Sequence, residues 1–494
     1  PVVCAHDMSN SLGFYERTVT AVLNAQLIPL MNSLIISMEK VMRDAGIDAP
    51  LTIVKGDGHS IISEYAKSYP VETILSGPAS SAIGGKFLTG EQNAIIVDIG
   101  GTTTDIVCID DCETVTEKTG MNIEGVKTRV KSVKVSTFGL GGDSYIRINE
   151  GGEITYGPEK VIPICTIATQ YPYLTEELKK YRLGKEYLIM ERQETDILRL
   201  NRAINSEKNC ENDILKYIKD GPHTLVYIAE KLGTDIDSLD IGSIIESGSA
   251  ELISMTPTDL VHATGEYCKW DKDAATVAAE IFAERLCMST GEFLENAVNG
   301  FVNRLCTCII ESAIALDGVT SNLSPKYMAE YIFNNANNKE RKHCYIDFRL
   351  NRPLIGIGAP APVWINKAAD MLGAELIIPE YNDVANAVGA AAGDVREIVE
   401  AVICRDELLD EYNVYLPDER CTFDDLYNAK LYAGKKLARY AERFSKKLYV
   451  RDPEIDVEFE DFMIDDVCNG SKEFVKSTVY ATIRGNFNIN KDLF

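Results

Sequence analysis

The sequence lacks the residues from which metal centres and disulfide frameworks are usually built. It has five histidines in 494 residues, and none of them forms an HxH or HxxxH pair, so no dedicated zinc site is expected. Its 13 cysteines are scattered, and the closest pair, Cys306 and Cys308, lacks the wider spacing of a zinc knuckle. An odd number of cysteines without a visible signal peptide indicates free thiols in a reducing cytoplasm.

Positive charge is also scarce. The chain has 50 Lys and Arg against 75 Asp and Glu, which gives a formal charge of −25. This balance repels nucleic acid and anionic membranes. No apolar run reaches the roughly 18 residues that a membrane-spanning helix needs. We therefore expect neither a nucleic acid nor a membrane as a partner.

The rest of the composition is typical of a globular protein with several structural units. Hydrophobic residues make up 45% of the chain, and 494 residues exceed what one hydrophobic core usually supports. A long helix is predicted over 14–45, with a kink or restart at Pro29. Later in the chain, strands alternate with helices, namely strand 354–358, a helix to 372, strand 375–378 and helix 384–392. This order predicts an α/β fold with parallel strands.

The segment 172–254 has the pattern of an insertion that resembles a winged helix. Between 207 and 251 it has ten acidic residues against four lysines, a net charge of −6, and no basic recognition face. The pattern therefore favours a structural or protein-binding insert over a DNA-binding one. From about 403 to the end, a charged helix and alternating strands predict a small α+β unit.

The stretch 93–110, NAIIVDIGGTTTDIVCID, predicts a phosphate-binding hairpin. A buried strand ends at Asp98, Gly100 and Gly101 make the turn, and a second strand follows the three threonines. Glycines let backbone N–H groups approach an anion, and threonine hydroxyls add donors. Asp98, at the end of the strand, is placed to hold a metal-bound water. The alternative is a tight hairpin that is merely rich in glycine and threonine.

Three further segments have the composition of ligand-facing turns. Lys55-Gly56-Asp57-Gly58-His59 follows a predicted strand over 51–54, a typical place for a ligand loop in an open α/β sheet. Thr137 to Ser144 is a second glycine-rich turn after a strand predicted over 127–136. Ser76 is the predicted N-cap of a helix whose small residues suggest close packing against another backbone.

The order of these motifs resembles the hydantoinase/5-oxoprolinase A family over roughly residues 10–400. The motifs that carry the resemblance are ERTVTAVLNA (16–25), VKGDG (54–58), LSGPASSAIGG (75–85), VDIGGTTTDI (97–106), TFGLGGDS (137–144), TPTD (256–259), IGIGAPAP (355–362) and NDVANAVGAA (382–391). The resemblance implies an actin/hexokinase/Hsp70-like fold with ribonuclease H-like domains that close on Mg-ATP. It also implies ATP-driven phosphorylation of a cyclic amide, such as a hydantoin or 5-oxoproline.

The resemblance assigns roles to individual residues. The expected catalytic residues are Asp98, Thr102 and Asp105, with Asp98 holding Mg²⁺ through water. The expected nucleotide-binding residues are Gly100, Gly101, Thr102, Thr103, Gly139, Gly141, Gly142, Gly356, Gly358 and Ala359. The expected substrate-facing residues are Lys55, Asp57, His59 and Ser76.

One feature departs from the family. Proteins of this fold have two phosphate loops, but only one DxGGTxxD motif is present, at 98–105. Because the chain starts at Pro1, we expect a missing N-terminal segment or a partner subunit, within an oligomer of identical or different chains. The predicted organisation is the remainder of a first ATPase domain (1–92), a second ATPase domain (93–171 and 255–402), the insertion (172–254) and the C-terminal unit (403–494).

Three functions fit these features. The first is an ATP-dependent hydrolase of cyclic amides. The second is the ATP-using subunit of a ketone carboxylase, which resembles the same family. The third is a non-catalytic, ATP-dependent activase or regulatory subunit, for which the acidic insertion would serve as a docking element.

Overall fold

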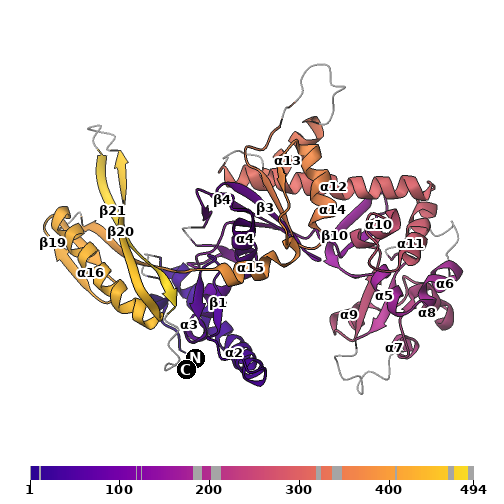
Figure 1. Ribbon diagram of the computed structural model, residues 1–494, viewed down its shortest axis with the longest axis horizontal. Coiled ribbons are helices and arrows are strands. Elements are labelled where there is room, and N and C mark those ends of the chain that lie inside the picture. The colour runs from indigo at the N-terminus through magenta and orange to yellow at the C-terminus, as the bar shows by residue number, and fades with distance from the viewer. Residues whose placement is uncertain are drawn as a thin grey trace. The chain divides into compact units, whose positions relative to one another are not determined.

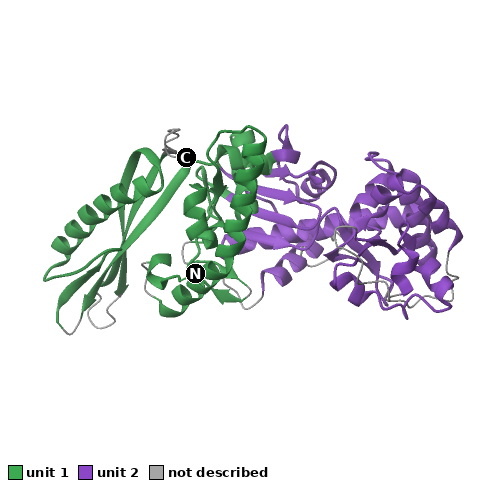
Figure 2. Ribbon diagram, turned by 90° about the horizontal axis from the view of Figure 1, so that it is seen from below, with its two compact units in different colours: residues 1–92, 109–134, 385–494 green, residues 93–108, 135–384 purple. Residues whose placement is uncertain are grey.

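The computed structural model describes residues 2–9, 13–117, 120–123, 125–181, 192–201, 213–318, 324–336, 346, 348–406, 409–465 and 472–487. The chain divides into two compact units (Figure 2). Unit 1 comprises 1–92, 109–134 and 385–494, and unit 2 comprises 93–108 and 135–384.

Unit 2 is built around a sheet with parallel strands at its centre. The strands β16 (Leu376–Ile377), β15 (Leu354–Ile357), β3 (Ala94–Ile99) and β4 (Thr104–Asp110) follow one another in the sheet, and β8 (Val135–Phe138) pairs with β4. β15 runs parallel to both β3 and β16, with Ile357 opposite Asp98. All four residues of β15 are buried, as expected for a central parallel strand. The predicted α/β arrangement is confirmed.

Helices of unit 2 begin where the sequence signals place them. Ser289 caps α12 (Thr290–Leu316), which follows α11 (Lys272–Arg285). Thr256 and Asp259 form a reciprocal capping box at the start of α10 (Pro257–Thr264). α14 (Ala361–Leu372) packs its Trp364 against Phe301 of α12, with the ring centroids 4.3 Å apart. α13 covers Pro325–Ala336.

The remaining elements of unit 2 are a hairpin and the segment predicted as an insertion. The hairpin is β9 (Ser144–Ile148) with β10 (Ile154–Lys160). Next come β11 (Ile162–Pro163), α5 (Ile164–Gln170), α6 (Tyr173–Lys180), β12 (Ile197–Leu200), α7 (Asp213–Tyr217), β13 (His223–Thr224), α8 (Leu225–Leu232), α9 (Gly242–Glu246) and β14 (Ala250–Ser254). The four strands pair in the order β11-β14-β12-β13, and the helices bury Ile214, Ile228 and Ile244 in a core of their own.

Unit 1 contains two groups of elements, seen at the two ends of the colour scale in Figure 1. The first group is α1 (Ala5–Met8), α2 (Phe14–Asp44), β1 (Thr52–Val54), β2 (Ser60–Ile62), α3 (Ser63–Ser68), η1 (Pro70–Thr73), α4 (Ser76–Thr89), β5 (Glu113–Thr114), β6 (Asn122–Ile123) and β7 (Val126–Lys127). The second group is α15 (Ala385–Ala392), β17 (Val395–Asp406), β18 (Glu411–Tyr415), β19 (Arg420–Phe423), α16 (Leu426–Lys447), β20 (Val450–Asp465) and β21 (Lys472–Phe487).

The C-terminal sheet of unit 1 has one face covered by a helix. Its strand order is β19-β18-β17-β21-β20, and all neighbours are antiparallel. α16 buries Ala433, Leu437 and Ala441 against Val479 and Ile483 of β21. β17 belongs to this sheet, so residues 395–402 lie in unit 1, although the sequence pattern had grouped them with the parallel strands.

Two glycines allow α4 and α15 of unit 1 to pack in backbone contact. A Cβ on Gly84 would lie 1.8 Å from the carbonyl oxygen of Ala385, and a Cβ on Gly389 would lie 1.8 Å from that of Ser80. Asn386 donates to the Gly77 carbonyl across the same contact at 2.9 Å. This confirms that the small residues after Ser76 pack against another backbone.

Three local predictions were wrong. The predicted restart at Pro29 is absent, because the long helical runs on both sides of it outweigh the one hydrogen bond that proline removes from α2. Residues 128–132 are irregular, so 127–136 does not form one strand. Leu75, with φ 65°, is the N-cap of α4, and Ser76 is already its first helical residue.

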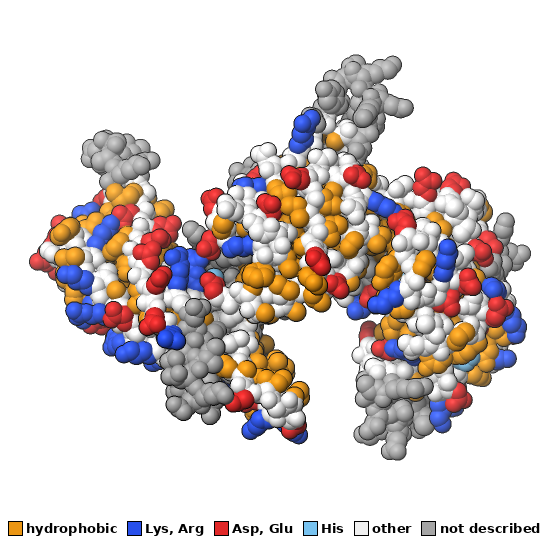
Figure 3. Space-filling model, in the orientation of Figure 1, with side chains coloured by type: hydrophobic (Ala, Val, Ile, Leu, Met, Phe, Trp, Pro, Cys, Tyr) orange, Lys and Arg blue, Asp and Glu red, His pale blue; other side chains and the backbone are white. Residues whose placement is uncertain are grey.

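α2 also corrects the prediction about apolar runs. By length and composition it could cross a membrane, because residues 18–38 include Asn, Gln and Ser but no charged side chain. Only Thr20, Ala21, Asn24 and Ile35 are buried along its 31 residues. Its exposed apolar side chains include Leu30, Leu34 and Val41, and Figure 3 shows hydrophobic side chains gathered over this helix.

Candidate functional site

Three of the glycine motifs meet at one edge of the unit 2 sheet. β3 and β15 are parallel, so their carboxyl ends lie at the same edge, where ligands of open α/β sheets usually bind. Gly358, which follows β15, has φ +94°. A Cβ at this position would lie 2.3 Å from the Ile99 carbonyl oxygen and 2.9 Å from Asp98 Oδ1. Only glycine therefore fits beside the Asp98 carboxylate.

The second glycine turn packs directly onto the hairpin turn. The Gly142 N–H donates to the Gly100 carbonyl at 2.9 Å, and the Asp143 N–H donates to the Gly101 carbonyl at 2.7 Å. A Cβ on Gly141 would lie 2.5 Å from the same Gly101 oxygen. The two glycine turns are therefore in direct backbone contact.

Hydroxyl groups hold the turns together. Thr104 donates to the Leu140 carbonyl at 2.6 Å, and Thr258, at the start of α10, donates to the Gly142 carbonyl at 2.7 Å. Thr258 was not identified from the sequence as a site residue, although its TPTD motif was noted. The hydroxyl of Thr104 is thus used within the protein, whereas Thr102 at the tip of the turn is exposed.

The hairpin turn leaves backbone donors for a ligand. The Gly100 N–H closes the turn by donating to the Thr103 carbonyl at 2.9 Å, so it does not point outward. In the described part of the chain, the N–H groups of Gly101 and Thr102 donate to no protein acceptor. Adjacent free N–H groups at a glycine turn suit an anionic ligand such as phosphate.

Three carboxylates lie at this edge. Asp105 accepts a hydrogen bond from Thr137 at 2.6 Å, and its pKa is raised chiefly by burial, with a further contribution from the charge of Asp98. Asp143 lies beside the hairpin turn, and a Cβ added to Gly101 would be 2.6 Å from Asp143 Oδ2. Burial also raises the pKa of Asp143, opposed by Lys160 at 3.6 Å.

These acids fit a hard cation. Carboxylate oxygens are the ligands that Mg²⁺ prefers, and phosphate oxygens complete its coordination in nucleotide sites. Asp143 and Thr137 are site residues that the sequence reasoning missed. Both lie within the TFGLGGDS motif, but only its glycines had been assigned a role.

The last turn is fixed by an asparagine. The Gly358 N–H donates to the Asn382 backbone carbonyl, and Asn382 Nδ2 donates to the Gly358 carbonyl, both at 2.9 Å. Gly356 lies within β15 and faces Ile365, whose Cγ2 would be 2.7 Å from an added Cβ. Ala359 is exposed at the tip of the turn, whereas Gly139 lies against Pro158.

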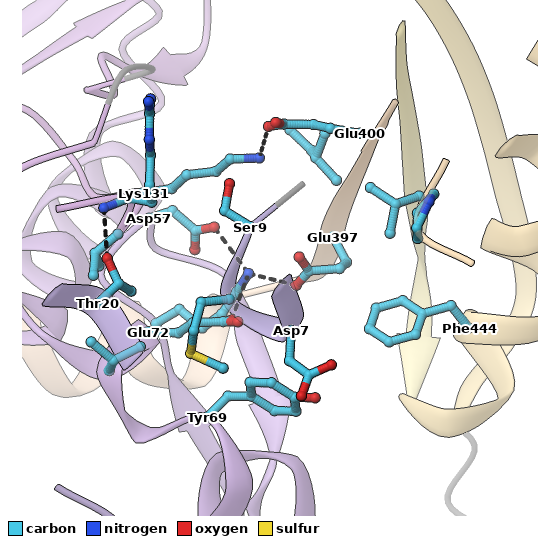
Figure 4. A pocket seen from close by; sticks show the side chains of 18 of the residues that line it. Asp7, Ser9, Thr20, Asp57, Tyr69, Glu72, Lys131, Glu397, Glu400 and Phe444 are labelled. Atoms are coloured by element: carbon cyan, nitrogen blue, oxygen red, sulfur yellow. Dashed lines mark hydrogen bonds and ion pairs between the residues drawn. The ribbon is translucent and has the colours of Figure 1, made fainter. Parts of the chain in front are cut away.

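Two of the predicted substrate residues, Lys55 and Asp57, lie in a cluster of charged side chains in unit 1, and Figure 4 shows Asp57 beside Glu72 and Glu397. The side chain of Lys55 is 5% exposed, and its amino group lies 3.0 Å from Asp57, 2.7 Å from Glu397 and 3.7 Å from Glu72. Burial alone would lower the pKa of Lys55 and is the largest single effect. The three carboxylates together outweigh it, so the pKa of Lys55 is raised well above its ordinary value. Glu72 and Glu397 were not identified from the sequence.

A cavity of about 180 Å³ adjoins this cluster and is lined by Lys55, Asp57 and Glu72, among others. His59 and Ser76 do not line it. His59 instead pairs with Asp394 at 2.8 Å, and Ser76 is the first residue of α4. The four residues predicted to face substrate are thus only partly brought together.

Comparison with known proteins supports the resemblance drawn from the motifs. Residues 17–163 match the family Hydantoinase/oxoprolinase. Over 171 residues, the chain is 29% identical to "Caprolactamase subunit alpha" of Pseudomonas jessenii. Over 173 residues, it is 26% identical to "Acetophenone carboxylase gamma subunit" of Aromatoleum aromaticum. The matched segments cover 33% of this chain and 24% and 23% of those relatives.

Two solved structures share the fold over nearly the whole chain. The ATP-dependent caprolactamase from Pseudomonas jessenii has a TM-score of 0.54 at 17% identity, and nucleotide-free acetone carboxylase has 0.53 at 15%. They align with 98% and 97% of this chain, respectively. The chain spans only 60% and 59% of those proteins, so it corresponds to a part of their length.

Proposed function

We propose that this chain, whose residues 17–163 match the hydantoinase/oxoprolinase family, is the ATP-binding part of an enzyme that opens a small cyclic amide. A hydantoin, N-methylhydantoin or 5-oxoproline is the substrate class. The fold is of the actin/hexokinase type, with ribonuclease H-like domains. The observation that carries the proposal is the convergence of three glycine turns and three carboxylates at the carboxyl edge of β3 and β15.

The chain's own groups fit Mg-ATP in distinct ways. The Gly101 and Thr102 N–H groups are the donors for phosphate oxygens, and the Thr102 and Thr103 hydroxyls supplement them. Asp98 would hold Mg²⁺, and Asp105 and Asp143 would add negative charge beside it. The turns at Gly139–Gly142 and Gly358–Ala359 form the walls on either side. When bound, Mg-ATP would supply the phosphoryl group that activates the amide carbonyl, so that water attacks its carbon, the ring C–N bond breaks, and ADP and phosphate leave.

Phosphoryl transfer depends mostly on orientation and electrostatics, so rigid turns are what the protein must supply. The internal hydrogen bonds of Gly100, Gly142 and Gly358 fix the backbone around the free donors. Asp98 is fixed at the end of a buried strand and against Gly358, where no side chain could intervene. These features predict little rearrangement of the turns when nucleotide binds.

The test is ATP hydrolysis by the full-length protein in the presence of a panel of cyclic amides. Stimulation of hydrolysis by a cyclic amide, with stoichiometric ring opening, is the expected result. Hydrolysis that responds to none of the amides but to a ketone with bicarbonate would replace the proposal by the second candidate, a ketone carboxylase subunit. The likeness to an acetophenone carboxylase subunit favours that candidate. If neither the amides nor a ketone with bicarbonate stimulate ATP hydrolysis, the third candidate, a non-catalytic activase or regulatory subunit, is favoured.

We also infer that another polypeptide covers α2, either a further segment of the same protein or a partner subunit. α2 exposes Leu30, Leu34 and Val41 at 69%, 50% and 67%, which is unusual for apolar side chains that remain in water. The relatives named above are called subunits alpha and gamma, which suits a multi-chain assembly. Association of the helix with lipid vesicles instead of with protein would contradict this inference.

A further inference from the structure

The cavity beside Lys55 has its own arrangement of charged groups and is separate from the proposed nucleotide site. All its residues lie in unit 1, and it lies outside the three glycine turns of unit 2. Three carboxylates surround one ammonium group, so the cluster has a charge of −2 if every group is ionised. The rest of the cavity lining adds two acids, Asp7 and Glu400, and two bases, Arg129 and Lys131. These four charges cancel, so the net charge of −2 is unchanged. An excess of negative charge in a cavity disfavours an anionic ligand.

Glu72 has one carboxylate oxygen that accepts no hydrogen bond from the described residues. Its Oε1 accepts a hydrogen bond from Tyr65 at 3.2 Å. Its Oε2 is buried and, among the described residues, accepts no hydrogen bond; its nearest cation, the Lys55 amino group, lies at 3.7 Å. A buried carboxylate oxygen without a donor is costly, and a ligand that donates to it would be stabilised. Figure 4 shows Glu72 and Asp7 on the same side of the cavity.

Aromatic rings form much of the remaining wall. Tyr65 and Tyr69 stack with ring centroids 4.5 Å apart, and Phe444 lies edge-on to Tyr65 at 6.1 Å. Tyr440 stacks on Phe444 at 5.9 Å. All four rings line the cavity. An acidic floor with an aromatic wall is the arrangement that recognises organic cations, because ring faces attract positive charge.

We propose that this cavity binds a small organic cation, a primary alkylammonium, whose N–H groups donate to Glu72 Oε2 and whose alkyl chain contacts the tyrosine wall. A divalent metal is disfavoured, because the Lys55 amino group already stands among the three carboxylates and the aromatic rings offer no ligand oxygens. A neutral amide could donate one hydrogen bond but would leave the excess charge uncompensated. The site is independent of the proposed ATP-dependent reaction.

Ligand binding should be linked to a proton on Glu72. Burial, and then the charge of Glu397, raise the pKa of Glu72 to about 7, while Lys55 and the Tyr65 hydrogen bond oppose the shift. The titratable groups that face Glu72 are Lys55, Asp57, Tyr65, Tyr69 and Glu397. An ammonium group favours the ionised carboxylate, so its binding expels the proton. Affinity should therefore rise with pH and level off above about 7.

The experiment is isothermal titration calorimetry of the full chain with n-butylammonium chloride, butyramide and sodium butyrate. We expect n-butylammonium to bind about tenfold more tightly at pH 8 than at pH 6, and the other two probes to bind at least about tenfold more weakly. Glu72→Gln should weaken amine binding and abolish its pH dependence. Glu64→Gln, an exposed glutamate on α3, is the control and should bind as the wild type does.

Two outcomes would overturn the proposal: similar binding of all three probes, or unchanged amine binding by Glu72→Gln. A melting curve shows whether Glu72→Gln is folded. If it is not, the wild-type protein still decides the matter. Titrations at pH 6 in two buffers of different ionisation enthalpy should show the release of close to one proton per amine bound. Release of no proton would reject the role of Glu72.

Discussion

Asp98 is the residue on which the proposed chemistry most depends. It ends the buried strand β3, is only half-buried itself, and faces Gly358 from the neighbouring strand. Its negative charge also raises the pKa of Asp105. The position combines a rigid backbone with access to a ligand, which is what a metal-positioning carboxylate requires.

Asp98→Asn in the full-length protein should lower the rate of amide-stimulated ATP hydrolysis by at least about a hundredfold, because a preorganised charge at the transferred group is lost. The melting temperature should change little, since Asn has the same shape. Glu150→Gln, an exposed change in the β9–β10 turn, is the matched control and should retain wild-type activity. Near wild-type turnover by Asp98→Asn would remove Asp98 from the mechanism.

Glu72 predicts a pH-dependent stability. Its pKa of about 7 in the folded protein exceeds the ordinary value of 4.5, so the folded state binds more protons between these values. Stability is therefore lost as pH rises from about 4.5 through about 7. Glu72→Gln should be more stable than the wild type at pH 8, by on the order of 2 kcal/mol after allowance for the 27% exposure of the side chain, and not at pH 4.5. Urea unfolding at the two pH values measures this; an equal effect at both would refute the linkage.

At the scale of elements, the helices of unit 1 differ in how closely other parts of the chain pack against them. α4 and α15 approach so closely that Gly84 and Gly389 leave no room for a methyl group. α2, in contrast, leaves most of its apolar residues in contact with solvent. The contact between α4 and α15 therefore depends on the small size of its glycines. The exposed apolar face of α2 depends instead on whether another polypeptide covers it.

Gly84→Ala should destabilise the protein by roughly 1–3 kcal/mol, because the new methyl group would collide with the Ala385 carbonyl. Gly77→Ala in the first turn of the same helix meets no atom within 4 Å and should be neutral or slightly stabilising. Chemical denaturation of both variants measures the difference. Equal stability of the two would show that α4 and α15 are not in backbone contact.

On α2, the double variant Leu34→Asp and Val41→Asp should change the unfolding free energy by less than about 1 kcal/mol, because both side chains are exposed. Ile35→Asp, at the neighbouring and fully buried position, should cost more than about 3 kcal/mol. The double variant should also lose any polypeptide that co-purifies with the wild-type chain. Strong destabilisation by the double variant would mean that the face is already covered within this chain.

At the scale of the whole molecule, the chain spans about 60% of the structurally related proteins and has one DxGGTxxD motif. The proposed nucleotide site therefore has one phosphate loop where a fold of this kind uses two. Acidic charge dominates the surface, with 75 acidic against 50 basic residues, and this suits small-molecule chemistry better than nucleic-acid binding.

The isolated chain should consequently bind ATP weakly and turn over little or no cyclic amide. Supplying the second phosphate loop, as a longer chain or a co-expressed subunit, should raise both binding and turnover. Equilibrium binding of a fluorescent ATP analogue and a coupled phosphate assay measure the two effects. Full ATP-dependent ring opening by the isolated chain would show that one loop suffices.

Local signals in the sequence determined most of the elements and the sheet edge at which the glycine turns lie. Helix caps such as Ser289 and the Thr256–Asp259 capping box depend on neighbouring residues alone. The alternation of strands with helices along the sequence predicted the parallel strands. The hairpin at 93–110 and the turn at 137–144 were identified because glycines mark backbone conformations directly. They meet because β8 runs antiparallel to β4, with Phe138 opposite Thr104, so the turn after β8 lies at the same edge as the hairpin turn before β4.

Only the tertiary structure decided which distant side chains share one environment. Glu397 lies 342 residues from Lys55 in the chain, yet it makes the shortest contact with the Lys55 amino group. Lys55 lies in a glycine motif, but Glu397 is not unusual in its local sequence, so no periodicity or motif could have paired the two. The pKa of Glu72, like the cavity beside it, arises from burial and from charges brought together by folding. Local patterns specify backbone geometry, whereas electrostatics depends on three-dimensional proximity.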